Sequence, residues 1–337
     1  MGVRTRFRLI QLFVLVFSLA LAFPAAYGQR KPILIGYSSL SSNQAAIWVA
    51  KEQGFFKKFG LEAELIFIEG GTRGAQTLIS GDLPLLTMGG QPVLNARARG
   101  ADLVLIAGLV NQMNYILVSA PGVKKPEDLR SKRIAISQIG TSSHHAAILT
   151  LKHWGLDVRR DRITILQVGN QAARVSSLQS GGSDVVIVNP GLGPTLKARG
   201  FNVLADFTEL PISYPLIALA TRERFLKSEP DMAERILMSI VTANAFILDP
   251  ENKEKVKAVL AKYLRLDGPE KAEEQYQAGL KVFVRKPYVE LAGIASMIEL
   301  MAESDPSVAK LKPETIVNHS LLKRLDEAGF IDELSRR

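Results

Sequence analysis

The sequence predicts an α/β protein of two related lobes, each built on a mostly parallel sheet, with a ligand cleft between them. Short apolar runs typical of strands alternate with helical patterns from about residue 33 to residue 220. The order of strand, hydroxyl-rich turn and helix beginning with Ala-Ala-Ile occurs over residues 33–50 and again over residues 133–148. Two shorter matches have the same spacing: 78–81 with 178–181, and 98–100 with 198–200. Repeats about a hundred residues apart are too widely spaced for a solenoid and indicate two lobes of similar topology.

Length and composition are those of a globular protein with enough chain for two hydrophobic cores. The 337 residues are 47% hydrophobic and 22% charged, and the formal net charge is +9. Basic and acidic residues are mixed along helical segments such as 251–262, so we expect solvated faces and no nucleic-acid partner. The chain contains no cysteine. This excludes disulfides, thiolate metal sites, a cysteine nucleophile and a lipidated cysteine behind a signal sequence.

The first 28 residues have the pattern of a secretory signal peptide. Arg4, Arg6 and Arg8 form a basic region, residues 9–23 are almost wholly apolar, and Ala26-Tyr27-Gly28 is a small-x-small site. A single membrane anchor is the alternative, but the apolar run is short for a membrane span. We therefore expect cleavage after Gly28 and a soluble periplasmic protein.

Lobe one is expected to comprise residues 29–119 and 216–337. Its predicted strands are 33–35, 63–68, 85–87, 103–109 and 115–119, and polar or glycine-rich turns follow them. Ligands of such sheets bind at the carboxyl ends of the strands. The candidate ligand contacts from these turns are Ser39, Leu40, Asn43, Gln44, Gly71, Thr72, Arg73, Gly90, Gln91, Asn111 and Tyr115. Helices that wrap this lobe are predicted over 231–248, 251–264, 269–283, 287–303 and 320–328.

Lobe two is expected to comprise residues 120–215. Its predicted strands are 133–136, 163–168, 185–188 and 203–206. Its candidate ligand contacts are Gly140, Thr141, Ser142, Ser143, His144, Asn170, Asn189 and, on the return to lobe one, Tyr214. We expect the chain to cross between the lobes near 119–122 and 211–216, and these crossings would be the hinges of a closing motion.

The hydroxyls of Thr141, Ser142 and Ser143 are the best candidates for an anion cradle. They stand where a strand passes into a helix, so backbone N–H groups and the positive end of the helix dipole lie behind them. The same residues could serve only as helix caps. Asn43 likewise suits both a cap and a ligand contact.

Four other candidates also have a structural interpretation. His144 stands on the first turn of its helix and could reach the cleft, although a lone histidine there is more often structural. Arg73 could bind an anionic ligand or pair with Glu69, and we favour the ion pair. Tyr115 and Tyr214 could form the floor of the pocket or pack at the hinge.

Two long segments carry a resemblance to a known family: Ile-Gly-Tyr-Ser-Ser-Leu-Ser at 35–41 and Trp-Val-Ala-Lys-Glu-Gln-Gly-Phe-Phe at 48–56. Shorter ones lie at 70–73, 76–78, 129–134 and 327–332. From about residue 32 onward the chain resembles the substrate-binding proteins of nitrate/sulfonate/taurine-type ABC importers. The resemblance implies a type II periplasmic binding fold, in which two α/β lobes joined by two crossovers clamp a ligand. It also implies an ABC permease as partner, and ligands such as alkanesulfonates, taurine, nitrate, aromatic carboxylates or thiamine-pyrimidine precursors.

We therefore expect a monomeric solute-binding protein that captures a small anionic organic solute, a sulfonate or carboxylate, and delivers it to a permease. Nitrate is less expected because no basic cage is evident. We expect no cofactor and no metal, since the four histidines lack ligand spacing. We also expect no enzyme: nucleophile-elbow and Walker motifs are absent, and the related pyrimidine-synthesising branch uses a cysteine-rich motif. The alternatives are a periplasmic sensor or scavenger on the same fold, and a binder of a thiamine-pyrimidine precursor.

Overall fold

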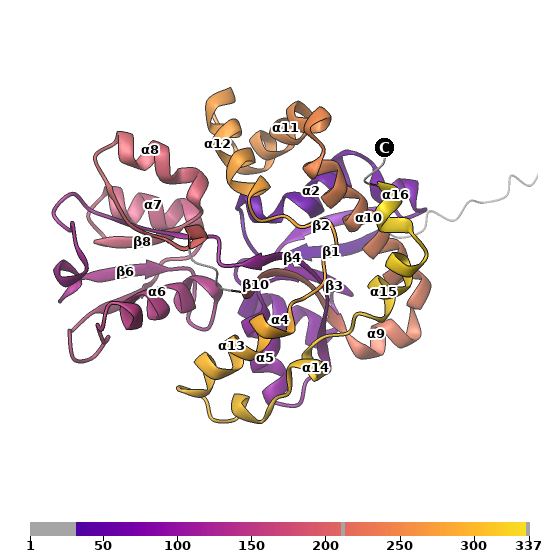
Figure 1. Cartoon of the computed structure of the whole chain (residues 1–337), viewed down its shortest axis with the longest axis horizontal. Coiled ribbons are helices and arrows are strands. Elements are labelled where there is room, and N and C mark those ends of the chain that lie inside the picture. The colour runs from indigo at the N-terminus through magenta and orange to yellow at the C-terminus, as the bar shows by residue number, and fades with distance from the viewer. Residues whose placement is uncertain (1–31, 210–212, 335–337) are drawn as a thin grey trace, which may run out of the picture. The chain divides into compact units, whose positions relative to one another are not determined.

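The computed structural model describes residues 32–209 and 213–334, in which two five-stranded sheets form the centres of two lobes (Figure 1). The first sheet has the strand order β2-β1-β3-β10-β4. Its strands are β1 (Ile33–Tyr37), β2 (Ala63–Phe67), β3 (Leu85–Met88), β4 (Leu103–Gln112) and β10 (Ser213–Arg222). The second sheet has the order β7-β6-β8-β5-β9. Its strands are β5 (Ile116–Ser119), β6 (Arg133–Ile136), β7 (Thr164–Gln167), β8 (Val185–Val188) and β9 (Asn202–Asp206).

The two sheets share one topology, which confirms the predicted two-lobe α/β fold. In each sheet the first parallel strand lies between the second and the third and is parallel to both. One antiparallel strand is inserted beside the third, β10 in the first sheet and β5 in the second. Each inserted strand follows a crossing of the chain from the other lobe. The repeated sequence segments 33–50 and 133–148 therefore occupy equivalent places in the two lobes.

Helices follow most of the strands, and serine, threonine, asparagine or glycine stands at the first or the capping position of several of them. Those of lobe one are η1 (Ser42–Gln44), α2 (Ala45–Glu52), α3 (Phe55–Lys58), α4 (Gly71–Ser80) and α5 (Gly90–Ala98). Those of lobe two are η2 (Pro126–Leu129), α6 (Ser142–His153), α7 (Gln171–Gln179), η3 (Pro190–Leu192), α8 (Gly193–Ala198) and η4 (Phe207–Glu209).

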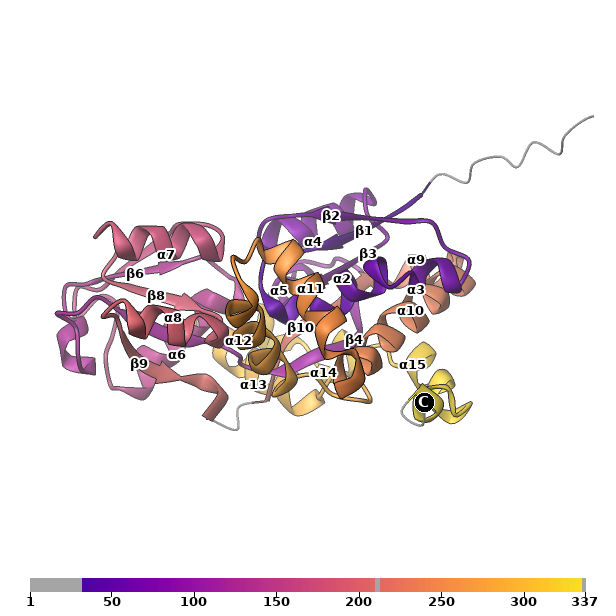
Figure 2. The ribbon, with the colours of Figure 1, turned by 90° about the horizontal axis from the view of Figure 1, so that it is seen from above.

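The chain after β10 is helical, as predicted, and surrounds the first sheet (Figure 2). Its helices are α9 (Glu223–Ser228), α10 (Pro230–Leu248), η5 (Pro250–Asn252), α11 (Lys253–Leu264), α12 (Pro269–Leu280), α13 (Leu291–Ala302), η6 (Val308–Lys310), α14 (Pro313–Ile316), α15 (Ser320–Glu327) and α16 (Phe330–Leu334). Of these, α12 also contacts lobe two, where Thr195 Oγ1 donates to Glu274 Oε2 at 3.2 Å.

Helix α2 is held against the first sheet by aromatic packing. The Trp48 ring is fully buried and stacks on Tyr263 of α11, with ring centroids 4.9 Å apart. It also meets Tyr37 of β1 edge-on at 5.8 Å, and such aromatic pairs add to the stabilisation from burial. The packing of α11 on α2 therefore helps to fix where β1 ends and η1 begins, at the edge of the sheet that faces lobe two.

The predicted first crossing and one strand assignment are wrong. The strand predicted over 115–119 and placed in lobe one is β5, which pairs with β8 and β9 in the second sheet. The chain therefore leaves lobe one at residues 113–115, and the segment 119–122 lies within lobe two. The predicted second crossing at 211–216 lies partly outside the described residues, and its described part belongs to β10. The predicted signal peptide, residues 1–28, lies outside the described residues altogether.

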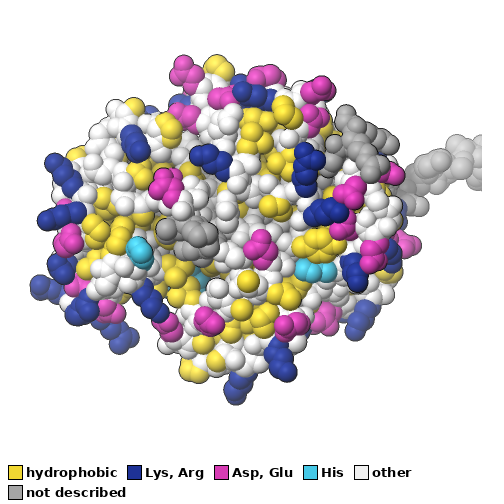
Figure 3. Space-filling view, in the orientation of Figure 1, with side chains coloured by type: hydrophobic (Ala, Val, Ile, Leu, Met, Phe, Trp, Pro, Cys, Tyr) yellow, Lys and Arg dark blue, Asp and Glu magenta, His cyan; other side chains and the backbone are white. Residues whose placement is uncertain are grey.

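Charged side chains of both signs are interspersed on the face shown in Figure 3. Ion pairs at the surface of the described residues include Arg133 with Asp184 at 3.0 Å and Arg224 with Asp102 at 2.8 Å. Within residues 32–209 and 213–334, none of the helices has the length and hydrophobicity needed to cross a membrane.

Candidate ligand-binding site

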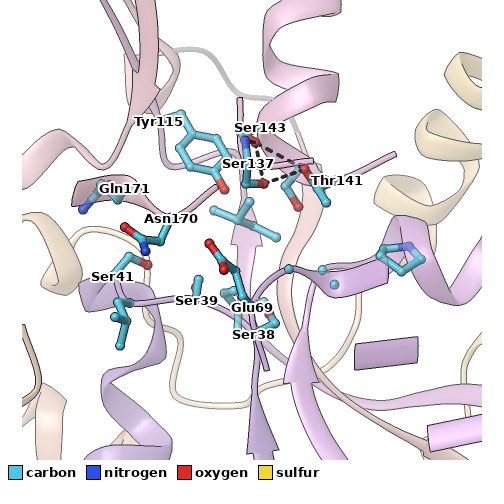
Figure 4. Close-up of a pocket in the computed structure, with 18 of the residues that line it drawn as sticks. Ser38, Ser39, Ser41, Glu69, Tyr115, Ser137, Thr141, Ser143, Asn170 and Gln171 are labelled. Atoms are coloured by element: carbon cyan, nitrogen blue, oxygen red, sulfur yellow. Dashed lines mark hydrogen bonds between the residues drawn. The ribbon is translucent and has the colours of Figure 1, made fainter. Parts of the chain in front are cut away.

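The carboxyl ends of strands from both sheets border a small cavity of about 60 Å³ (Figure 4). Lobe one lines it with Ser38, Ser39, Leu40, Ser41, Phe67, Glu69, Gly70, Gly71, Gly89, Pro92, Leu216 and Ile217. Lobe two and the first crossing line it with Tyr115, Ser137, Thr141, Ser142, Ser143, Asn170, Gln171 and Arg174. The wall thus combines hydroxyls and amides with one carboxylate and one guanidinium.

Three hydroxyls from the turn between β6 and α6 form a cluster on the lobe-two wall, and Figure 4 shows their mutual hydrogen bonds. Ser137 Oγ lies 2.8 Å from Thr141 Oγ1 and 2.9 Å from Ser143 Oγ. Ser143 Oγ also accepts from the Ser137 backbone N–H at 2.9 Å. The cluster stands at the N-terminus of α6, a helix of 12 residues. The positive end of the α6 dipole and the hydroxyl groups together favour an anionic or strongly accepting ligand group.

Arg174 places a buried positive charge at the cavity wall. Its side chain lies on α7, which Asn170 caps by accepting the Ala173 N–H at 3.0 Å. Arg174 is 5% exposed; its Nε donates to the Ile187 carbonyl at 2.9 Å and its Nη1 to the Gly169 carbonyl at 2.8 Å. Within the described residues Nη2 forms no hydrogen bond, and the guanidinium has no ion-pair partner.

Burial sets the electrostatics of this guanidinium. Loss of hydration lowers the pKa of Arg174 to about 10, while the nearby side chains of Tyr115 and Glu69 act to raise it. Arg174 therefore remains charged at neutral pH. A buried cation without a protein counter-ion is unfavourable, and an anionic ligand in the cavity would compensate it.

Glu69 faces the cavity from lobe one. It follows β2 and precedes α4, and its carboxylate points into the cavity in Figure 4. The carboxylate approaches lobe two closely, because a Cβ atom added at Gly169 would lie 2.8 Å from Glu69 Oε1. In the described part of the chain, the Glu69 side chain has neither a hydrogen-bond partner nor an ion-pair partner. The cavity thus contains an acidic group as well as a basic one.

A network of buried amides joins the lobes near the cavity. Asn43 Oδ1 accepts from Asn114 Nδ2 at 2.6 Å and from Asn189 Nδ2 at 3.3 Å. Asn189 Oδ1 in turn accepts from Ser42 Oγ at 3.2 Å. Asn114 belongs to the first crossing, Asn189 follows β8, and Ser42 and Asn43 belong to η1. Two candidate ligand contacts, Asn43 and Asn189, therefore bind each other across the cleft and do not line the cavity.

The structure brings several of the sequence candidates together around the cavity. They are Ser39, Leu40, Gly71, Tyr115, Thr141, Ser142, Ser143 and Asn170. The hydroxyl turn is thus at the cavity, as the repeated strand–turn–helix element led us to expect. Ser142 also makes a contact between the lobes, since its Oγ donates to Gln91 Oε1 at 3.1 Å.

The other candidates lie outside the cavity lining. Two of them use their amides within lobe one: Gln44 Nε2 donates to Ser39 Oγ at 3.2 Å, and Asn111 Nδ2 donates to the Tyr288 carbonyl at 2.7 Å. Thr72 and Arg73 are exposed. The expected ion pair between Arg73 and Glu69 is not formed within the described residues. Gly90 begins α5, behind the cavity wall.

The two histidines in the first turn of α6 have structural contacts. His144 Nδ1 accepts from the Gly140 backbone N–H at 3.3 Å, which supports the turn. His145 is buried and lies 3.3 Å from the hydroxyl of Tyr214 on β10. Burial lowers the pKa of His145 to about 4 and raises that of Tyr214. Both groups are therefore neutral at pH 7. Tyr214 packs between the lobes and does not line the cavity. Of the two roles considered for it, the structure thus favours packing.

Arg174 is the most informative residue that the sequence analysis missed. A signal was available, because Arg174 falls four residues after the cap Asn170, where a cation opposes the helix dipole. Arg73 also stands in the first turn of a helix, α4, but the structure leaves it exposed. Ser137 could also have been noticed, since it directly follows the buried strand β6. Glu69 was considered only as a partner for Arg73.

Comparison with known proteins now gives the family. A family model described as "NMT1/THI5 like" matches residues 41–253, which include all of lobe two and most of the residues that line the cavity. The chain belongs to this family. It is 26% identical over 254 residues to the taurine-binding periplasmic protein of Escherichia coli K12, covering 74% of this chain and 77% of that protein.

Solved structures of periplasmic binding proteins share the fold. The nitrate-binding protein NrtA of Synechocystis PCC 6803 superposes with a TM-score of 0.74, at 14% identity over 89% of each chain. The alkanesulfonate-binding protein SsuA of Xanthomonas axonopodis pv. citri, bound to MOPS, gives 0.66 at 19% identity, covering 88% of this chain and 98% of that one. The resemblance to sulfonate- and taurine-type binding proteins is confirmed, as is the predicted fold class. These relatives are periplasmic solute-binding proteins.

Proposed function

We propose that this chain is the solute-binding protein of an ABC importer and that its ligand is a small organic anion, a sulfonate or a carboxylate. The observation that carries the proposal is Arg174, a buried guanidinium at the cavity wall that lacks an ionic partner within the described residues. The hydroxyls of Ser137 and Ser143 at the N-terminus of α6 would supply further hydrogen bonds to an acidic group.

Capture would proceed by closure of the two lobes. The chain crosses between the sheets at residues 113–115 and again between β9 and β10, and these two segments would serve as the hinge. Because the cavity wall comes from both lobes, a ligand binds more groups in the closed arrangement and shifts the population toward it. The permease would then recognise the closed form.

The site of action would be the periplasm. The basic and apolar pattern of residues 1–28 supports export with cleavage after Gly28, and the periplasmic relatives agree with it. We propose a monomer, since one chain supplies both walls of the cavity. An adjacent permease and ATPase in the genome would favour import over sensing or scavenging.

The test is binding of organic anions to the purified protein by thermal shift and calorimetry. A ligand at about 1,000 times its dissociation constant should stabilise the fold by about 4 kcal/mol. Arg174→Gln should weaken binding by at least about 2 kcal/mol, the lower range for breaking a buried charge pair. Arg174→Lys, which keeps the charge, should retain part of the affinity.

The matched control is Arg73→Gln, because Arg73 lies in the first turn of α4 in lobe one and is exposed. Its affinity should equal that of the unaltered protein. The proposal would be wrong if no sulfonate or carboxylate bound, or if a folded Arg174→Gln variant bound its ligand as tightly as the original.

A further inference from the structure

The cavity contains an acidic residue that an anion-binding site does not need. Glu69 lies in the lining together with Arg174, yet the two side chains form no ion pair. Within the described residues each also lacks any other ionic partner. They come from opposite lobes, Glu69 from the β2–α4 turn and Arg174 from α7. A purely anionic ligand would be attracted by one of these groups and repelled by the other.

The position of Glu69 is built into the backbone on both sides of the cleft. Gly70, with φ +80°, leaves room for Gln138, since a Cβ atom there would lie 2.3 Å from Gln138 Oε1. Gly169, with φ +99°, leaves room for Glu69 itself, whose Oε1 would lie 2.8 Å from a Cβ atom. Both backbone conformations favour glycine. The two turns therefore allow the carboxylate to extend between the lobes.

The polar groups around the two charges differ in kind. Arg174 shares the lobe-two wall with the hydroxyls of Ser137 and Ser143, which can donate to an acidic group, whereas Thr141 Oγ1 donates to the Gln138 carbonyl at 2.7 Å. A carboxylate such as that of Glu69 can only accept, so its natural ligand partner is a donor, and the strongest donor is a protonated amine. The cavity wall thus offers donors and a positive charge from lobe two, and an acceptor with a negative charge from lobe one.

We propose that the ligand is bipolar, with an acidic group bound at Arg174 and a protonated amine bound at Glu69. This inference rests on the proposed function, because it assumes that the cavity between the lobes is the solute site. The small volume, about 60 Å³, limits the spacer between the two charged ends to a few atoms. Short amino acids and short aminosulfonates have this chemistry.

The experiment compares ligand pairs that differ only in the amine, by calorimetry with the purified protein at pH 7. The pairs are 2-aminoethanesulfonate with ethanesulfonate, and 3-aminopropanoate with propanoate. In at least one pair the amine-bearing member should bind at least tenfold more tightly. Glu69→Gln should remove this preference by weakening the amine-bearing member tenfold or more, while the amine-free member keeps or gains affinity.

Glu64→Gln is the matched control, because Glu64 is exposed on β2, five positions before Glu69. It should keep the preference. If both members of each pair bound equally to the unaltered protein, the bipolar ligand would be overturned and the proposed function would stand. This result does not depend on whether Glu69→Gln folds. A preference that survives in folded Glu69→Gln would overturn the role of Glu69. No binding by any of the four compounds would count against this inference and the proposed function together.

Discussion

At the scale of single residues, Gly169 connects the backbone to the charge arrangement of the cavity. Its φ of +99° is unfavourable for an L-residue, and a Cβ atom would lie 2.8 Å from Glu69 Oε1. We expect Gly169→Ala to lower the free energy of unfolding by about 1 kcal/mol or more through backbone strain. We also expect it to weaken ligand binding, because the new methyl group displaces the Glu69 carboxylate. Chemical denaturation and calorimetry measure the two effects separately.

Gly181 provides the control for that substitution. Its φ is +74°, and an added Cβ atom would meet nothing within 4 Å. Gly181→Ala should therefore destabilise the protein by a similar amount and leave ligand affinity unchanged. Equal affinities in the two variants would show that the contact with Glu69 has no influence on binding.

At the scale of elements, α6 contacts β10 through the neutral side chain of His145. This burial makes the free energy of unfolding depend on pH. His145 has a pKa of about 4 in the folded protein, lowered first by burial and then by the nearby His144, against 6.5 ordinarily. Between these values the unfolded chain binds a proton that the folded chain does not. The free energy of unfolding should therefore decrease as the pH falls from 6.5 toward 4, by about 2 kcal/mol down to pH 4.5.

Urea denaturation across that range, with the variant His145→Gln, tests this assignment. Glutamine does not titrate and retains an acceptor for the Tyr214 hydroxyl, so the slope with pH should become smaller. The exposed His153 at the end of α6 offers the comparison, since His153→Gln should keep the slope of the unaltered protein. An unchanged slope in His145→Gln would assign the pH dependence to other groups.

The elements themselves were largely predictable from sequence. The repeated strand–turn–helix segments placed β1 with α2 and β6 with α6 correctly, because local patterning and capping residues determine such elements. The sheet that β5 joins was not predictable. Its residues, Ile116–Ser119, form a uniformly buried run, and such a run fits the centre of either sheet. Its pairing with β8 and β9 depends on the path of the chain between the lobes.

The site was less predictable than the elements for a related reason. Turns at the carboxyl ends of strands identified the correct edge of each sheet, and the hydroxyls of Thr141 and Ser143 line the cavity. Asn43 and Asn189, which also stand in turns after strands, hydrogen-bond across the cleft instead. The partner of an amide side chain depends on how the opposite lobe is placed, and that information is absent from the local pattern.

At the scale of the whole molecule, the buried amides between the lobes should favour the closed arrangement even before a ligand binds. Asn189 is fully buried and connects lobe two to Ser42 and Asn43 of lobe one. A hydrogen bond of this kind contributes about 1 kcal/mol net. Asn189→Ala removes two such bonds between the lobes, about 2 kcal/mol in all, so the ratio of closed to open molecules should fall roughly tenfold or more. The apparent dissociation constant should rise as the closed fraction falls, because the closed form is the one proposed to bind the ligand.

Small-angle X-ray scattering of the ligand-free variant should show a larger radius of gyration than the unaltered protein, and saturating ligand should remove the difference. Asn202→Ala is the control, because Asn202 Nδ2 donates only to carbonyls of lobe two among the described residues, including that of Val123 at 2.9 Å. It should lower stability without changing affinity or size. If Asn189→Ala kept the ligand affinity and the ligand-free radius of gyration of the unaltered protein, the closed arrangement would not depend on the amide network. Ligand contacts at Arg174 and Glu69 would then have to drive closure by themselves.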